Sequence, residues 1–378
     1  MITHYRDMAA DESRINAFRR AIEAVVKPGD VVADLGCGLG TYAIFACRAG
    51  AGRVYAVERE DIILIAKQIA EENGCADRIE FIRADAVSAA VPEPADVLIT
   101  EALAVTFVDP DTERLLAHAR RGLLKTSGRL IPASVSIRAA PVSCPQLYGR
   151  IDPWADDGTA YGIDFSAARE PVMNTVHKVG LRASHLVGKP KELHRVDLAA
   201  GGEFVFDVAV RWRAQRTATV HGLAVWFDAQ LAPRVRLCNA PGAPPTLWGQ
   251  GFLPLAAPLA AKKNGIIAGD AAARIGPGGE RAWWQWEVSA GGRSSDGTTF
   301  RSFPTSLADL AAGSKEARPG LSMEGRITAC ILRSLESGCT IADAAGRLRR
   351  EFPDRFPTVR SALARAGAEA RRLGGRPE

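Results

Sequence analysis

The sequence predicts three parts in series: an α/β Rossmann-like domain, an antiparallel β-barrel domain and a small helical C-terminal domain. Short apolar runs alternate with helical patterns up to residue 132. Short alternating strands separated by Gly/Pro-rich turns follow, and helical periodicity returns near the C-terminus. We therefore expect domains at 1–132, 133–312 and 319–378.

The first domain is predicted from alternating helices and strands. Apolar residues at steps of three and four predict a helix over 7–27, and further helices are expected at 41–49 and 61–72. The expected strands are 31–35, 53–57, 79–82 and 96–100. Strands that alternate with helices at this spacing are typical of a doubly wound parallel sheet.

The second and third predicted domains differ from the first in their sequence patterns. The segments SVSIRAA, EFVFDVAVRW, HGLAVWFDAQL and AWWQWEV alternate like strands, and NAPGAPP and GPGGE are typical turns. The polar joint GSKEARPG (313–320) precedes the helical patterns MEGRITACILRSLES and TIADAAGRLRREF, and a last helix is expected from Thr358. Residues 319–378 hold 11 Arg against 7 Asp and Glu, a net charge of +4.

Composition excludes several classes of protein. The 378 residues are 47% hydrophobic and 24% charged, as in ordinary globular proteins, and no apolar run is long enough to span a membrane. The N-terminus lacks a signal-peptide pattern, so we expect a cytoplasmic protein. Seven cysteines without a CxxC pair predict neither a disulfide framework nor a zinc site, and no metal is expected. The net charge of +5 permits an acidic partner without requiring one.

A glycine-rich loop is the strongest motif. DLGCGLG (34–40) follows a predicted strand and precedes a helix, where free N–H groups and closely approaching backbone suit a ligand. The GxGxG spacing resembles the class I S-adenosylmethionine (SAM) methyltransferases, whereas dinucleotide enzymes use GxGxxG. A nicotinamide cofactor or an empty fold is the alternative. The candidate cofactor-binding residues are Asp34, Gly36, Cys37, Gly38 and Gly40 in the loop, Glu58 for the ribose hydroxyls and Asp85 for the adenine amino group.

Six further segments carry a family resemblance from about Tyr5 to Phe303. These are DESRINAFRRAI (11–22), ADVLITEA (95–102), GRLIPAS (128–134), YGIDFS (161–166), HGLAVWFDAQL (221–231) and TLWGQGFLPL (246–255). In this order and spacing the chain resembles the protein arginine methyltransferases. The resemblance implies an arm-exchanged homodimer, with the dimerisation arm near 145–180.

The resemblance also implies roles for single residues. Arg14 falls where the family pairs an arginine with the SAM carboxylate, and Glu101 falls at the first glutamate of the family's double-glutamate loop. Tyr5, Met8 and Trp248 are expected to line the substrate pocket. From the residues alone, Glu101 could instead be a helix N-cap, and Trp248 could be simple core packing.

Three positions depart from the family pattern. The second family glutamate would fall at Pro110, which leaves Asp109 and Asp111 as candidate catalytic partners of Glu101. Leu247 replaces the histidine of the family's Thr-His-Trp segment, and Tyr5 stands where the family has a histidine. A guanidinium stays protonated at ordinary pH, so carboxylates are needed to orient it and draw its charge away from the attacking nitrogen.

We therefore predict a SAM-dependent methyltransferase, arginine N-methyltransferase-like, acting on an arginine-containing peptide, a protein or free arginine. The alternatives are an N- or O-methyltransferase of another small metabolite and a non-catalytic SAM-sensing regulator. The C-terminal domain weakly resembles PqqD-type peptide-holding domains. A DNA-binding helix-turn-helix or winged-helix unit and a solvated bundle that caps the barrel are its alternatives. Neither nucleic acid nor a membrane is expected as a partner.

Overall fold

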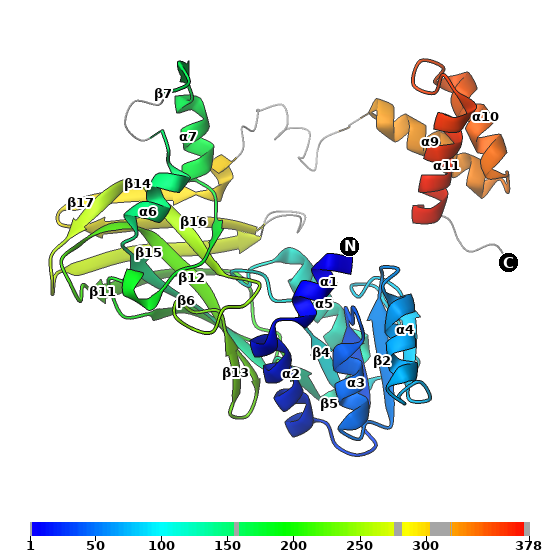
Figure 1. Ribbon diagram of the computed structural model, residues 1–378, viewed down its shortest axis with the longest axis horizontal. Coiled ribbons are helices and arrows are strands. Elements are labelled where there is room, and N and C mark those ends of the chain that lie inside the picture. The colour runs from blue at the N-terminus through cyan, green and yellow to red at the C-terminus, as the bar shows by residue number, and fades with distance from the viewer. Residues whose placement is uncertain (1, 155–158, 276–281, 303–317, 319, 374–378) are drawn as a thin grey trace. The chain divides into compact units, whose positions relative to one another are not determined.

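The computed structural model describes residues 2–154, 159–275, 282–302, 318 and 320–373 (Figure 1). The chain divides into two compact units, residues 1–304 and residues 305–378. The predicted joint at 313–320 lies outside the described residues except for residues 318 and 320. Each unit is described separately below.

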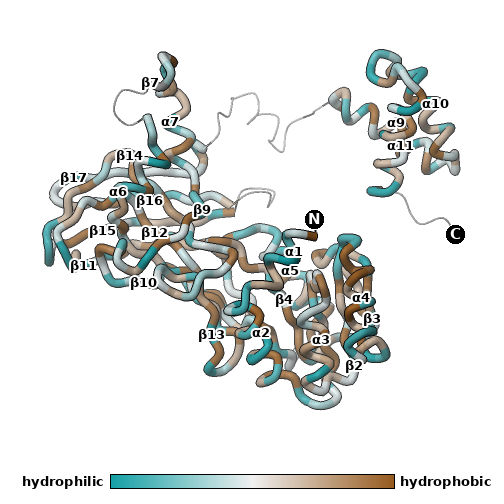
Figure 2. The backbone as a smooth tube through the Cα atoms, viewed as in Figure 1, coloured by the Kyte–Doolittle hydropathy of each residue, from teal (hydrophilic) through white to brown (hydrophobic). Residues whose placement is uncertain are grey.

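A five-stranded parallel sheet forms the centre of the N-terminal part of the first unit. Its strands are β1 (Val31–Leu35), β2 (Arg53–Glu58), β3 (Ile79–Arg83), β4 (Ala95–Thr100) and β5 (Leu124–Ile131), in the order β3-β2-β1-β4-β5. Every residue of β1 is buried, as expected for the central strand of a sheet covered on both faces. Hydrophobic residues colour much of this region brown in Figure 2. The predicted Rossmann-like fold is confirmed.

The helices of this part are α1 (Ile2–Ala9), α2 (Glu12–Val25), α3 (Thr41–Arg48), α4 (Ile63–Glu72) and α5 (Pro110–His118), followed by the π-helical turn η1 (Ala119–Leu123). The single helix expected over 7–27 is wrong, because two helices meet there. The Asp11 carboxylate accepts a hydrogen bond from the Arg14 backbone N–H (3.1 Å) and so caps the start of α2. Apolar periodicity continues across this break, which is why the pattern did not show it.

Antiparallel strands make up the rest of the core of the first unit. One sheet contains β6 (Ser134–Val142), β9 (His177–Val179), β10 (Lys191–Asp197), β12 (Ala218–Ala232), β13 (Val235–Cys238) and β14 (Gln250–Ala261). A second sheet has the order β11 (Phe206–Arg213), β15 (Ile266–Ile275), β16 (Ala282–Ala290) and β17 (Arg293–Thr298). Trp212, Trp226 and Trp286 are almost fully buried within this domain. The predicted antiparallel domain is confirmed, and the turn expected at 276–280 lies outside the described residues.

The segment predicted as a dimerisation arm contains α6 (Pro145–Ile151), the hairpin strands β7 (Thr159–Ala160) and β8 (Ile163–Asp164), and α7 (Ser166–Met173). Tyr161, at the tip of the hairpin, is 98% exposed. The hairpin and α7 extend away from the sheets in Figure 1, whereas α6 lies against them, with the Tyr148 hydroxyl donating to the Leu255 carbonyl of β14 (2.7 Å). Two short 3-10 turns, η2 (Ala183–His185) and η3 (Thr299–Ser302), complete this unit.

The second unit is a small bundle of three helices with its own core. The helices are α9 (Met323–Glu336), α10 (Ile341–Glu351) and α11 (Val359–Leu373). Thr340 and Asp343 form a capping box at the start of α10. The described residues of this unit include no strand that could form a wing. The predicted helical C-terminal part is confirmed, and no helix in the described parts of the chain is long and apolar enough to cross a membrane.

Candidate active site

The glycine loop lies between β1 and α3 and is held by backbone hydrogen bonds. Gly36, Gly38 and Gly40 all have positive φ angles, at 79°, 51° and 75°, a conformation that glycine adopts without steric cost. The Gly36 and Cys37 N–H groups both donate to the carbonyl of Val57 on β2, each at 2.9 Å. The loop is therefore fixed against the neighbouring strand.

Two buried carboxylates hold the loop from either side. Asp34, 1% exposed, accepts a hydrogen bond from the Ala43 N–H of α3 (3.0 Å). Glu58, 8% exposed at the end of β2, accepts from the Gly38 N–H and the Glu60 N–H, each at 3.0 Å. Each Glu58 oxygen can accept one more hydrogen bond, so the side chain remains able to bind ligand hydroxyl groups.

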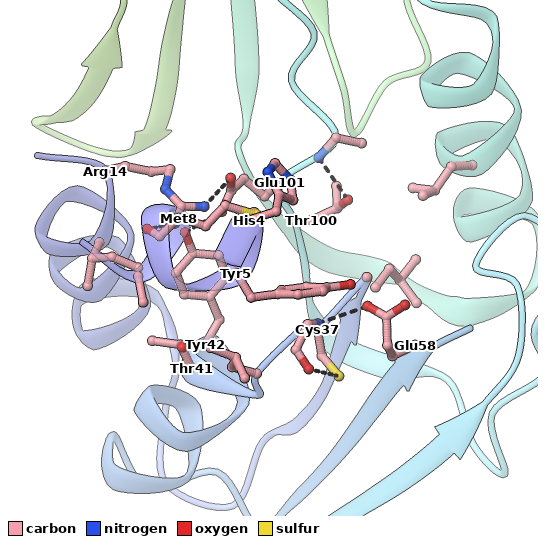
Figure 3. Close-up of a pocket in the computed structure, with 18 residues that line it drawn as sticks. His4, Tyr5, Met8, Arg14, Cys37, Thr41, Tyr42, Glu58, Thr100 and Glu101 are labelled. Atoms are coloured by element: carbon pink, nitrogen blue, oxygen red, sulfur yellow. Dashed lines mark hydrogen bonds and ion pairs between the residues drawn. The ribbon is translucent and has the colours of Figure 1, made fainter. Parts of the chain in front are cut away.

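Two cavities meet beside the loop. The first, of about 350 Å³, is lined by predicted residues of the cofactor and substrate sites: Tyr5, Met8, Arg14, Gly36, Cys37, Gly38, Glu58 and Glu101 (Figure 3). The second, of about 570 Å³, also contains Gly36, Glu58 and Glu101, and adds Asp85, Asp109 and Asp111. Glu101 thus lies where the two cavities join.

Glu101 follows β4 and is held by two donors at once. Arg14 Nη1 donates to one carboxylate oxygen, and the Tyr42 hydroxyl donates to the other at 2.5 Å. Arg14 Nη2 also donates to the carbonyl of Met8, which connects α1 to the same cluster. Burial raises the pKa of Glu101, and both Arg14 and Tyr42 counteract this increase by stabilising the ionised form.

The two candidate partners of Glu101 are engaged elsewhere. Asp109 is the N-cap of α5, where its carboxylate accepts from the Thr112 N–H (2.8 Å) and the Thr112 hydroxyl (2.9 Å). Asp111 forms an exposed ion pair with Arg114 on the same helix. Both line the second cavity with Glu101, but the described residues show no hydrogen bond between either aspartate and Glu101. Their catalytic roles stay predictions.

Of the other predicted site residues, Tyr5 and Asp85 line a cavity and Trp248 does not. A Cβ on Gly38 would lie 3.1 Å from the Tyr5 ring, so α1 lies directly over the glycine loop. Asp85 is exposed and lines the second cavity, with its carboxylate 3.6 Å from Arg59 Nη1. Trp248 packs edge-on against Phe227, with ring centroids 5.1 Å apart, and lines neither cavity.

Tyr42 is the residue that the sequence analysis missed. It lies in the first turn of α3, is buried, and stacks on Phe18 of α2 with ring centroids 4.5 Å apart. Burial and the neighbouring Glu101 raise its pKa well above the usual value, so its hydroxyl remains a donor. The only sequence signal was a polar aromatic residue two positions after the last loop glycine.

No group of three or more His, Cys, Asp or Glu side chains that could hold a metal ion is found among the described residues.

Comparison with known proteins supports the predicted class, the methyltransferases. A methyltransferase domain model matches residues 32–128, and a model of the arginine methyltransferase oligomerization subdomain matches residues 133–276. The chain is 29% identical over 239 residues to a probable protein arginine N-methyltransferase 6 of Arabidopsis thaliana, covering 60% of this chain and 54% of that protein. It is 27% identical over 281 residues to protein arginine N-methyltransferase 6 of Xenopus tropicalis, covering 71% and 83%. The chain therefore spans about half of the plant relative and most of the frog one.

Solved structures show the same fold. A Trypanosoma brucei PRMT1 enzyme–prozyme heterotetrameric complex with AdoHcy gives a TM-score of 0.73 at 23% identity, over 79% of this chain and 98% of that one. Arabidopsis thaliana protein arginine methyltransferase 10 gives 0.68 at 20% identity, with the same coverage.

The fold and the family matches define a chain in which a methyltransferase-type domain is followed by a β domain of the arginine methyltransferase oligomerization type. Over both domains the chain resembles the protein arginine methyltransferases, and the predicted family resemblance is confirmed.

Proposed function

We propose that this chain transfers a methyl group from SAM to a guanidinium nitrogen of arginine, in a peptide, in a protein or as the free amino acid. The observation that carries the proposal is Glu101, a partly buried carboxylate (side chain 13% exposed) held by Arg14 and Tyr42 where the two cavities join. A guanidinium donates hydrogen bonds in a planar fork, and a fixed carboxylate is its natural partner.

The residues of the first cavity fit SAM. Arg14 Nε is buried without a hydrogen-bond partner in the protein, so it has a donor left for the carboxylate of a ligand. Glu58 would hold the ribose hydroxyls, and Asp85 would contact the adenine amino group. Bound SAM supplies an electrophilic methyl group on its sulfonium. The glycine loop, together with Asp34 and Cys37, would shape the wall against which it lies.

Glu101 acts on the acceptor. Its negative charge orients the guanidinium and draws positive charge toward the nitrogens that it contacts, which leaves the remaining nitrogen a better nucleophile. Alignment of the acceptor nitrogen with the methyl group supplies the rest of the acceleration, which can reach several kcal/mol. Asp109 or Asp111 would assist only after leaving its present partner. Tyr5 and Met8 cover the cavity, and Trp248 belongs to this pocket only as a prediction.

We also propose that the chain works in the cytoplasm as a homodimer joined through the arm at 145–180, and that 1–132, 133–312 and 319–378 are its domains. The exposed tip residue Tyr161 and the match to the oligomerization subdomain support the dimer.

The helices of the second unit have a core of their own, which supports a separate C-terminal domain. Holding a peptide acceptor near the site is its first candidate role, because tethering raises the effective concentration of the acceptor.

The test uses SAM labelled in its methyl group, with free arginine, arginine-containing peptides and cell extract as acceptors. We expect label in methylarginine, and a loss of at least about 100-fold in Glu101→Gln, since a neutral amide cannot polarise the guanidinium. SAM binding is measured by calorimetry for both proteins. Label in another product would indicate a small-metabolite methyltransferase, and SAM binding without any turnover would indicate a sensor.

A further inference from the structure

Positive charge is concentrated at one end of the β domain. The segments 182–191, 211–217 and 262–266 contain eight Lys and Arg residues and no Asp or Glu. We call these eight residues the basic end: Arg182, Lys189, Lys191, Arg211, Arg213, Arg216, Lys262 and Lys263. The chain has 48 Lys and Arg against 43 Asp and Glu; without these eight, 40 remain, and the net charge changes from +5 to −3. These segments therefore hold a local excess of positive charge, as residues 319–378 do with their net charge of +4.

Hydrogen bonds show that the three segments lie together in space. The Gln215 N–H donates to the Val187 carbonyl (2.8 Å), and the Ala214 N–H donates to the Gly265 carbonyl (2.9 Å). A side-chain bond from Arg216 to the Ser184 carbonyl (3.3 Å) adds a third link. The segments belong to the ends of β10, β11 and β15 and to the turns beside them (Figure 2). Burial and the charges of Arg182 and Arg216 lower the pKa of His185, which agrees with a positive potential here.

A cavity of about 420 Å³ opens at the basic end. It is lined by Lys189, Lys191, Arg211, Trp212, Arg213, Ala214, Gln215, Asn264 and Ile266, without a carboxylate. Within the described residues, Lys189, Lys191 and Arg211 form no ion pair. Trp212 is 1% exposed, and its indole N–H has no acceptor. The charged side chains in the lining of this cavity are therefore all positive.

We propose that the basic end binds the phosphate backbone of duplex nucleic acid, independently of base sequence. Phosphates carry negative charge and accept hydrogen bonds, so they complement a surface that holds cations and no carboxylate. A folded acidic protein would need an apolar centre to its interface, but Ile266 is the one large apolar side chain exposed among the three segments. Binding of unpaired bases would need exposed aromatic rings, and Trp212 in these segments is buried. This inference goes beyond the proposed function, does not depend on it, and departs from the prediction that nucleic acid is not a partner.

The experiment measures fluorescence anisotropy of a labelled mixed-sequence duplex DNA of about 20 base pairs with the full chain, between about 50 and 200 mM salt. Each phosphate contact contributes about 0.9 to the slope of log affinity against log salt. Four contacts from the cavity cations would therefore give a slope near −3.6, by the same rule. In the double variant Lys191→Glu and Arg211→Glu we expect at least a tenfold loss of affinity at the lowest salt and a slope smaller by about two. Duplex RNA is expected to compete, because it presents the same phosphates.

The matched control is the double variant Lys27→Glu and Lys67→Glu, which makes the same charge change at two exposed lysines of the parallel-sheet domain. A second control, Arg349→Glu with Arg350→Glu, tests the arginines of α10. Thermal unfolding of each variant checks its fold, and Lys191→Gln with Arg211→Gln replaces the charge reversal if that variant unfolds.

Four results would overturn the proposal: no binding at low salt, equal losses in the basic-end and Lys27/Lys67 variants, loss only in the α10 variant, or equal competition by poly-glutamate of matched charge. None of these readouts requires methyl transfer, so failure here leaves the proposed function untouched.

Discussion

Glu101 is held by two donors, and Tyr42 is the one that the sequence did not reveal. The hydroxyl of Tyr42 donates to the ionised carboxylate at 2.5 Å and so opposes the increase in pKa that burial causes. A hydrogen bond to a charged group is worth about 1.5–3 kcal/mol, or about one to two pKa units. Tyr42→Phe removes the donor but keeps the ring that stacks on Phe18. We therefore expect the acid limb of the pH–activity profile to move to higher pH by about one unit.

The control for this prediction is Tyr55→Phe. Tyr55 is buried on β2 of the parallel sheet, but its hydroxyl donates to Glu93 at 3.2 Å, outside both cavities. NMR titration of carbon-labelled glutamate carboxylates gives the pKa of Glu101 in each protein without any turnover. If the pKa and the acid limb are the same in wild type and Tyr42→Phe, then Tyr42 only fills space.

Asp34 links the glycine loop to the pH dependence of stability. Burial raises its pKa to about 7, although the Ala43 N–H lowers it and Glu101 and Glu58 raise it further. The pKa of an unfolded aspartate is about 3.9. Between about pH 4 and about pH 7 the folded protein therefore holds a proton on Asp34 that the unfolded chain releases. This stabilises the folded protein fully below about pH 4, and the stabilisation is lost as the pH rises through about 7.

Asp34→Asn should remove this dependence, because an amide keeps an acceptor for Ala43 without titrating. We expect the difference in Tm between variant and wild type to shift in favour of the variant from pH 4 to pH 7.5. Thermal unfolding across this range measures it. Parallel Tm curves would mean that Asp34 titrates at its ordinary pKa in the folded protein.

At the scale of the element, the start of α2 connects the two domains of the first unit. Asp11 caps α2, and its second oxygen accepts from the Leu247 N–H of the β domain at 3.0 Å. Loss of a cap costs about 1 kcal/mol, and the connection to residue 247 is lost with it. For Asp11→Ala we expect a decrease of about 2–4 °C in Tm, measured by calorimetry. Asp11→Asn, which keeps one acceptor for the helix, should lose less; an equal loss in both would show that the charge, not the cap, matters.

The elements of the parallel-sheet domain show what the sequence could and could not predict. The strands β1 and β2 and the glycine loop were predicted because burial on both faces and free backbone groups leave local patterns. The break between α1 and α2 was missed because it depends on the Asp11 side chain, while the apolar spacing continues. The Tyr42–Glu101 bond joins residues 59 positions apart, and no local pattern records such a contact. Asp109 and Asp111 were chosen for their place in the sequence, whereas capping and an adjacent arginine decide where their carboxylates lie.

At the scale of the whole molecule, two surfaces differ in character. The tip of the arm exposes apolar side chains at Tyr161 and Ile163, as expected of a surface that another copy covers. The basic end exposes charge instead, with Ile266 as its one large exposed apolar residue. Self-association and polyanion binding should therefore respond to different substitutions and to different solution conditions.

This difference gives the last prediction. We expect a dimer at micromolar concentration by sedimentation velocity, and a monomer for Tyr161→Asp with Ile163→Asp, because two charges would replace the apolar tip. The dimer should persist at 500 mM salt, since burial of apolar surface is not screened, whereas binding at the basic end should be lost. Lys191→Glu with Arg211→Glu is the matched control and should remain a dimer. A wild-type monomer at micromolar concentration, or a dimer that survives the arm substitutions, would show that copies of this chain do not associate through the arm.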